Sequence, residues 1–468
     1  MAASVASVMT RAHSHRLRII VAALILFGLS VIVFAPGFVQ YDSVGQYAQA
    51  LTGQYDDWHP PIMARLWSLF VTHGAAPMLV LQLAGWWLGL GALAAAIVDR
   101  RPRGALLVLA VGLVPPWLGW QVAILKDAQM TGATLGAVGI IGWWRLRGQA
   151  VPRGAWAAAG LLLAYAALVR ANAIFAIAPL VALLVTERWP RRIALTVALT
   201  LATLAVAPFI NHRLLGAADS GVARTQALYD LAGIAVRVPY DPRLGLSPAE
   251  VADIRAKHCV KPFFWDPLGE PARCGARLQR FETTPPGRIY AKLAPAILHH
   301  PLAYAEQRLA HVNSTWRFRV PARWINAAPP QGSEPNDCHL GQPGRTALAW
   351  QKMAGDWVDV PIMWPVVWLV LAAGGLAVTR GDGFAGALFG SALGLEASFL
   401  VISVASDFRY HLWPIVACAL GLIIAKPWRG DRRIVWATGA VLAVVLILGG
   451  IARATLPPPP QSYAAMLI

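Results

Sequence analysis

Long apolar segments dominate this chain and restrict it to the folds that a lipid bilayer allows. Residues 17–35 are almost entirely apolar, and as a helix they would cross about 30 Å of hydrocarbon. Hydrophobic residues make up 57% of the chain and charged residues only 13%, a composition typical of membrane proteins. The sequence predicts an all-α polytopic membrane protein with about 11 transmembrane helices, at residues 17–35, 78–98, 105–120, 129–144, 155–168, 173–185, 193–210, 360–378, 384–406, 412–425 and 434–451.

The basic residues gather in short loops on one side of these segments. The formal net charge of +17 would point to nucleic acid in a soluble protein. However, the loops assigned to the cytoplasm hold 17 basic and 4 acidic residues, a net +13 of that total, as the positive-inside rule expects. No nucleic-acid partner is therefore predicted. The N-terminus is placed in the cytoplasm, and the first segment is read as an uncleaved anchor because no small-residue cleavage site follows it. The basic N-terminal cluster consists of Arg11, His13, His15, Arg16 and Arg18.

This topology divides the chain into three parts. Residues 1–210 form an N-terminal transmembrane module with a first outer loop at 37–77, in which 62–71 is too short to span. Residues 211–359, with 18 basic and 13 acidic residues, form one larger periplasmic domain. Residues 360–468 form a C-terminal transmembrane module and a Pro-rich tail. We expect a bacterial inner-membrane protein whose site faces the periplasm.

Three of the four cysteines lie in the outer domain, where an oxidising compartment allows pairing. Cys259 and Cys274 would close the shortest loop, and pairing of either with Cys338 remains an alternative. No C-x-x-C or H-x-x-x-H spacing accompanies them, so no metal site is predicted.

Polar residues recur in every short outer loop, at the ends of apolar segments. Charges in such positions are costly unless they are solvated or paired, and they are candidates for function. Each one taken alone could equally be an interfacial anchor or part of a structural ion pair. The candidates are Tyr41, Asp42, Tyr47, Asp56, Asp57 and His59; Lys126 and Asp127; Arg170 and Asn172; Tyr229 and Asp230; and Asp407, Arg409, Tyr410 and His411.

One exposed carboxylate facing several cations suits a transfer from a lipid phosphate. The leaving group is an anion, so the site needs cations to stabilise it and one base to accept the proton of an acceptor hydroxyl. Asp42 fits the base, because Ser43-x-x-Gln46 resembles a capping box that would place Asp42 just before a helix. Capping that helix is its structural alternative. The residues suited to binding the donor phosphate are His59, Lys126, Arg170, Arg409 and His411.

The motifs YDSVGQYAQALTGQYDDWHPP, LKD, LVRAN, YDLAGIA and DFRYHLWP together resemble the bacterial branch of the GT-C glycosyltransferase superfamily. Members of that superfamily, such as the protein mannosyltransferases and the lipid A aminoarabinose transferase, are polytopic enzymes that use polyprenyl-phosphate-linked sugars. The resemblance implies an inverting transfer, with Asp42 as the catalytic base and His59 at the donor phosphate. We also predict substrate-binding roles for Tyr41, Tyr47, Asp56, Asp57, Asp127, Asn172, Tyr229, Asp230 and Tyr410.

The family often has two adjacent acids, whereas Ser43 follows Asp42 here. No cofactor is therefore predicted, although Asp56 or Asp57 could be a second carboxylate and a divalent cation stays an alternative. The expected acceptor is the hydroxyl of a lipid, a glycan or a protein.

Two other functional classes remain open. A transporter or flippase of a lipid-linked saccharide would use the same cations, with charges or broken helices at mid-membrane, for which only Glu396 and Pro115-Pro116 qualify. Another membrane transferase, for acyl or phosphoethanolamine groups, is the other. ATP, NAD and nucleotide-sugar donors are disfavoured because the chain has no Walker loop or dinucleotide fingerprint.

Overall fold

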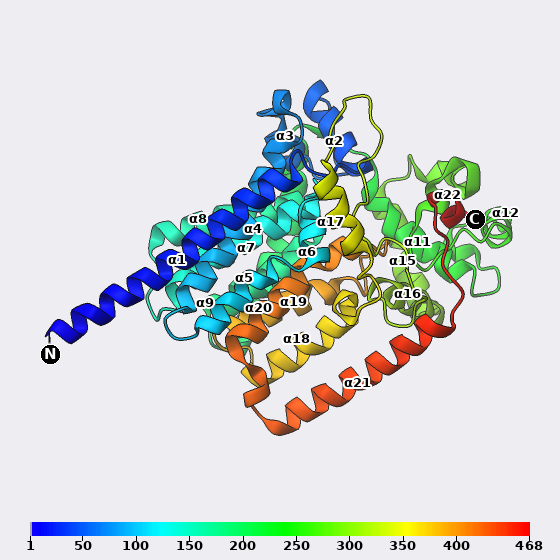
Figure 1. The fold of residues 1–468 in the computed structure, drawn as a ribbon. Coiled ribbons are helices and arrows are strands. Elements are labelled where there is room, and N and C mark those ends of the chain that lie inside the picture. Colours follow the sequence, from blue (N-terminus) through cyan, green and yellow to red (C-terminus); the bar gives the residue numbers. More distant parts are fainter. Residues whose placement is uncertain (1) are drawn as a thin grey trace.

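The computed structural model describes residues 2–468, with side chains from Ser14 onward, so the side chains of Arg11 and His13 lie outside the described part. The described chain is almost wholly helical, and its strands β1 (Tyr55–Asp56) and β2 (Ala217–Ala218) pair in parallel. The two ends of the chain lie at opposite ends of the molecule (Figure 1).

Helices lie at each predicted membrane segment. Five are long and apolar enough to cross a bilayer, and a bent pair of helices would make a sixth. The described chain is thus an α-helical protein with several helices that could span a membrane, and the count of about 11 stays a prediction. The five are Ser14–Phe34 within α1 (Ala2–Phe34), α4 (Ala76–Ile97), Trp189–Leu214, which joins α10 (Trp189–Phe209) to η3 (Ile210–Leu214), Phe408–Ala425, which joins η9 (Phe408–His411) to α20 (Leu412–Ala425), and α21 (Arg432–Thr455).

The remaining apolar helices are shorter or richer in small and polar residues. The predicted segment 384–406 is a helix only as far as Ser398. These helices are α7 (Lys126–Arg145), α8 (Arg153–Val169), α9 (Ile174–Val185), α18 (Pro365–Thr379) and α19 (Gly383–Ser398).

The predicted segment 105–120 is not one straight helix. It consists of α5 (Pro102–Val111) and α6 (Pro115–Gln121), which meet at an angle of 55°. Pro115 and Pro116 open α6 at its first positions, where proline is tolerated but cannot continue a preceding helix. The two prolines therefore explain why the helix breaks before Pro115.

The membrane helices pack closely through small residues. A Cβ added at Gly85 of α4 would lie 2.3 Å from the carbonyl oxygen of Gly132 in α7, so the two backbones touch. Small residues allow this approach between helices in a bilayer. The contact fixes α7, which begins at Lys126.

The predicted outer domain, called the outer domain below, has its own core, at the side of the molecule away from the N-terminus (Figure 1). Leu231, Ile254 and Leu293 are buried there. Its helices are α11 (Thr225–Ala235), α12 (Pro248–Ala256), α13 (Asp266–Gly269), α14 (Ala276–Leu278), α15 (Pro286–His299) and α16 (Pro301–Thr315). Short turns connect them: η4 (Val222–Arg224), η5 (Pro242–Leu244), η6 (Pro271–Gly275) and η7 (Gln279–Phe281). Later in the chain, α17 (Arg345–Gly355) packs against α6 instead, η8 (Pro361–Met363) precedes α18, and α22 (Tyr463–Leu467) ends the chain.

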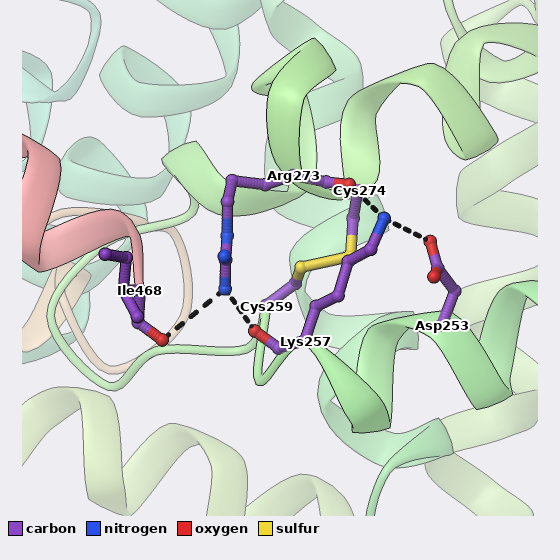
Figure 2. The surroundings of a disulfide bond; sticks show 6 residues. All are labelled: Asp253, Lys257, Cys259, Arg273, Cys274 and Ile468. Carbon is purple, nitrogen blue, oxygen red and sulfur yellow. Dashed lines mark hydrogen bonds and ion pairs between the residues drawn. A yellow bond between two sulfur atoms is a disulfide. The ribbon is translucent and has the colours of Figure 1, made fainter.

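A disulfide joins Cys259 to Cys274 in this domain (Figure 2). Lys257 and Arg273 flank it and exchange hydrogen bonds with each other's carbonyl oxygens, at 2.8 and 2.5 Å. Lys257 also pairs with Asp253 at 3.0 Å. Cys338 is an exposed free thiol and Cys418 is a buried one.

The first outer loop forms α2 (Tyr41–Thr52), β1, α3 (Ile62–Ser68) and η1 (Val71–His73). The short α3 agrees with the prediction that 62–71 does not span. β1 pairs with β2 just beyond η3, so this loop is attached to the start of the outer domain. The remaining single turns are η2 (Ala171–Ala173) and η10 (Pro427–Arg429).

Candidate functional site

The helix that carries Asp42 begins earlier than the sequence predicts. The N-cap of α2 is Gln40, whose backbone N–H donates to the Ser43 hydroxyl at 3.0 Å. Ser43 is therefore the third helical residue of a capping box that starts at Gln40, and Gln46 lies in the next turn. This corrects the prediction that Asp42 precedes the helix: it lies in the first turn, where the helix dipole favours a carboxylate.

Backbone contacts hold this turn beside the start of α7. Phe38 forms a parallel bridge with Ala123, and the Ile124 N–H donates to the Phe38 carbonyl at 2.7 Å. The Ser43 hydroxyl donates to the Ile124 carbonyl. These contacts bring Asp42 close to Lys126, although the two residues are far apart in sequence.

His59 lies between Asp42 and Lys126. Its Nε2 is 3.7 Å from Asp42 Oδ1, and its Nδ1 is 2.7 Å from Lys126 Nζ. Burial, with the charge of Lys126 beside it, lowers the pKa of His59 to about 3, so the ring is neutral near pH 7. An ammonium group only donates, so Nδ1 accepts and the ring proton belongs on Nε2, facing Asp42.

Arg409 contacts three carboxylates. Its guanidinium lies 3.0 Å from Asp42 Oδ2, 2.9 Å from Asp407 Oδ2 and 3.5 Å from Asp127 Oδ2. Asp407 also caps η9 by accepting from the Arg409 N–H at 3.2 Å. The backbone turn and the ion pairs together fix the Arg409 side chain.

Arg170 approaches the same group from the end of α8. It forms an ion pair with Asp127, whose side chain is only 2% exposed, and donates to Asn172 Oδ1 at 2.7 Å. The Tyr410 ring lies 4.2 Å from the Arg170 guanidinium and 5.5 Å from that of Arg409. Asp127, Asn172 and Tyr410 thus orient the two arginines.

We call this group the Asp42 cluster: Asp42, His59, Lys126, Asp127, Arg170, Asp407 and Arg409. Three carboxylates face two guanidinium groups and one ammonium group. Both arginines pair with carboxylates, whereas the close contact described for Lys126 is with the neutral His59 ring. Lys126 is therefore the cation best placed to take an anionic ligand.

Opposing effects set the ionisation of Asp42, whose side chain is 19% exposed. Burial alone would raise the pKa of its carboxyl group, but Arg409, Lys126 and His59 hold that pKa well below its ordinary value. Asp42 is thus a carboxylate throughout the physiological pH range, able to accept a hydrogen bond or a proton.

Several predicted site residues lie outside these contacts and have other partners. His411 is fully buried and pairs with Glu396 at 2.8 Å. The Tyr229 hydroxyl donates to the Lys261 carbonyl at 2.6 Å inside the outer domain. Its neighbour Asp230 pairs with Arg308 at 3.1 Å, and burial raises the Asp230 pKa to about 6.

The predicted residues of the first outer loop also divide. The Tyr47 hydroxyl donates to the Val71 carbonyl at 2.8 Å, which holds the loop together. Asp56 accepts from the Trp58 N–H at 3.0 Å, and Asp57 accepts from the Ser220 hydroxyl at 2.6 Å. Tyr41 is exposed at the start of α2. Asp56 and Asp57 are thus tied to other partners than Asp42.

Asp407 belongs to the cluster, although its position in the sequence predicts no specific role for it. The one sequence feature that points to Asp407 is its place directly before a short helical turn, where an Asp commonly caps the helix start. Among the described side chains no group of three or more His, Cys, Asp or Glu residues could hold a metal ion. The space between Asp42, Asp127 and Asp407 is filled by the Arg409 guanidinium.

No protein-family model, no curated protein and no solved structure matches this chain.

Proposed function

We propose that this protein is an inverting glycosyltransferase that moves a sugar from a polyprenyl-phosphate donor to an acceptor hydroxyl. In this proposal it is a GT-C-type enzyme of the bacterial inner membrane, with about 11 transmembrane helices, a cytoplasmic N-terminus and a periplasmic site. The observation that carries the proposal is the Asp42 cluster, in which an ionised carboxylate lies beside Lys126 and Arg409.

Four separate stretches of sequence supply this cluster. Asp42 and His59 come from the first outer loop, Lys126 from the start of α7, Arg170 from the end of α8 and Arg409 from η9. The sequence predicts all five for this chemistry. Arg170 and Arg409 are held in close ion pairs with carboxylates, whereas Lys126 acts on Asp42 only at longer range and makes its close contact with the neutral His59 ring, so its ammonium group is the one most available to a ligand.

In the proposed reaction the acceptor oxygen attacks the anomeric carbon of the donor sugar from the face opposite the phosphate. The bond between that carbon and the phosphate oxygen breaks, and its electron pair leaves with the lipid phosphate. The acceptor proton passes to Asp42. Lys126, assisted by Arg170 and Arg409, stabilises the charge that grows on the phosphate.

One observation favours a second candidate, a flippase of a lipid-linked saccharide. Glu396 and His411 form a buried pair within the apolar helices, and ionisable residues in such places often serve transport. The bent pair α5 and α6 adds a broken element. Neither feature contacts the Asp42 cluster through a described interaction, so we rank the transferase first.

The test supplies purified protein with a panel of polyprenyl-phosphate sugars and a crude envelope acceptor, and measures released polyprenyl phosphate. The transferase predicts release that requires the acceptor, is lost in Asp42→Asn and persists in Asp219→Asn, a matched change at an exposed outer carboxylate. Intact donor in every reaction, with the same lipid crossing between the leaflets of proteoliposomes, would replace the transferase by the flippase.

A further inference from the structure

Trp58 and Trp265 form an aromatic surface beside the Asp42 cluster. Their ring centroids are 6.0 Å apart and their planes meet at 43°. Trp58 comes from the first outer loop and is 42% exposed, whereas Trp265 comes from the outer domain and is half-buried. The pair therefore crosses the junction between the two parts.

Both tryptophans are tied to residues of the cluster. Trp58 directly precedes His59, whose ring faces Asp42. On the other side, Phe264 forms an antiparallel bridge with Ala405, and the Ser406 N–H donates to the Phe263 carbonyl at 2.7 Å. This places Trp265 beside the segment that continues into Asp407 and Arg409.

A further carboxylate, Asp266, follows Trp265 and is half-buried. Its Oδ2 accepts from the Tyr463 hydroxyl at 3.1 Å, and the carboxylate also accepts from its own backbone N–H. A carboxylate has about four acceptor sites, so Asp266 can still accept from a ligand hydroxyl. Burial raises the Asp266 pKa, and the negative charge of Asp42 contributes to that rise.

We propose that Trp58, Trp265 and Asp266 form a saccharide subsite that holds the acceptor ring with a hydroxyl toward Asp42. A pyranose ring has an apolar face of C–H groups that packs on an aromatic ring, and its hydroxyls seek acceptors at the edge. Trp58 and Trp265 supply the face and Asp266 the acceptor. This inference rests on the proposed transfer and names its acceptor class as a glycan rather than a protein side chain.

The alternative role of an exposed outer tryptophan is anchorage at the membrane interface. The two roles differ in what they require at position 58. Anchorage depends on an amphipathic ring at the membrane surface and involves no contact with a sugar, so a soluble pyranoside would bind equally well after Trp58→Leu. Stacking needs an aromatic ring, so Trp58→Phe would preserve most of it and Trp58→Leu would not.

The experiment is saturation-transfer NMR on the full-length protein in a detergent without a sugar head group. The probes are neutral, amino and N-acetylamino methyl pyranosides. We expect saturation of the ring C–H protons with the wild type, and about tenfold weaker binding in Trp58→Ala and Trp265→Ala, the size of one aromatic contact. Trp265→Phe keeps an aromatic ring at that position and should retain most of the binding, which controls for a folding defect, and Asp266→Asn should weaken binding.

Trp357→Ala is the matched control, because Trp357 is 37% exposed on the predicted outer side. No saturation with the wild type, equal binding in Trp58→Ala and Trp265→Ala, or full binding in Trp58→Leu would each overturn the subsite. Pyranoside binding that depends on both tryptophans, without acceptor-dependent lipid phosphate release, would overturn the transferase and leave the subsite standing. Lipid phosphate release that needs Asp42 but is unchanged in both tryptophan variants would overturn the subsite and leave the transferase standing.

Discussion

Asp42 shares its carboxylate between Arg409, at 3.0 Å, and the edge of the His59 ring, at 3.7 Å. Its low pKa keeps it ionised but also makes it a weak base. Proton transfer is therefore expected late, after the forming bond to the sugar has made the acceptor hydroxyl acidic. A donor phosphate that draws Arg409 toward itself would make Asp42 a stronger base.

The acid side of the pH dependence of transfer follows from these two side chains. Asp42 has its lowered pKa and His59 a pKa of about 3, so both keep their active forms, ionised and neutral, above that region. Activity is lost only as the pH falls far enough to protonate them. We expect kcat/KM to stay level on the acid side from about pH 7 to pH 5, well above those pKa values. A decline with a midpoint near the ordinary histidine pKa would contradict these assignments.

The sequence predicts which individual residues lie near the outer surface, but it does not predict which of their side chains face one another. Asp42, His59, Lys126, Arg170 and Arg409 converge, because their loops end on adjacent helices. His411 follows Arg409 by two residues, yet it points to Glu396 in the interior. The direction of a side chain in a tight turn depends on packing that no sequence pattern reports.

Among the elements, α16 attaches the outer domain to the membrane helices. Its Arg308 donates to the carbonyl groups of Phe399, Leu400 and Ser403 beyond the end of α19, at 2.9 to 3.1 Å, and pairs with Asp230. One side chain thus satisfies backbone acceptors that would otherwise be left at a helix end.

Loss of this arginine should be costly. Arg308→Met leaves Asp230 buried without its partner, and breaking a buried pair typically costs about 3 to 5 kcal/mol. We expect a clear fall in the thermal unfolding midpoint in detergent, whereas Arg277→Met, at an exposed arginine of the same domain, should leave it unchanged. An equal midpoint for both variants would mean that Arg308 does not hold the two parts together.

The disulfide also stabilises the outer domain. Cys259 and Cys274 are 15 residues apart, and closing a loop of that length contributes roughly 3 kcal/mol by restricting the unfolded chain. Cys259→Ser with Cys274→Ser should therefore lower the stability of the outer domain, as measured by its resistance to proteolysis. Unchanged resistance would show that the core around Leu231 and Leu293 suffices.

The apolar segments of the sequence predict where the helices lie, but they do not predict where each helix ends or breaks. The segment 384–406 looked continuous because residues 399–402 are apolar, yet α19 ends at Ser398 and the carbonyls of the following residues bind Arg308. A distant arginine decides that boundary. The start of α2 differs from the prediction because the Ser43 hydroxyl accepts from the Gln40 N–H and donates to the Ile124 carbonyl, so Ser43 is not the N-cap of the helix.

For the whole molecule, the assignment of sides can be tested with its own cysteines. Cys338 is the exposed free thiol of the described chain and Cys418 is buried, so a membrane-impermeant maleimide should label intact cells through Cys338. Cys338→Ser should abolish that labelling. Arg153→Cys in the Cys338→Ser background, at an exposed position on the opposite side, should react only after permeabilisation. The reverse pattern would invert the proposed topology.

The most direct test of the central claim measures donor-site binding and turnover separately. Polyprenyl phosphate is the binding probe, and its release from the panel of polyprenyl-phosphate sugars reports turnover. Lys126→Ala should weaken probe binding, because a lost charge-assisted hydrogen bond costs about 1.5 to 3 kcal/mol, and Lys352→Ala should not. Asp42→Asn should bind the probe at least as well as the wild type, since it frees Arg409, yet lose about 10² to 10⁴ in rate. Normal turnover by Asp42→Asn, or probe binding that ignores Lys126, would contradict the account.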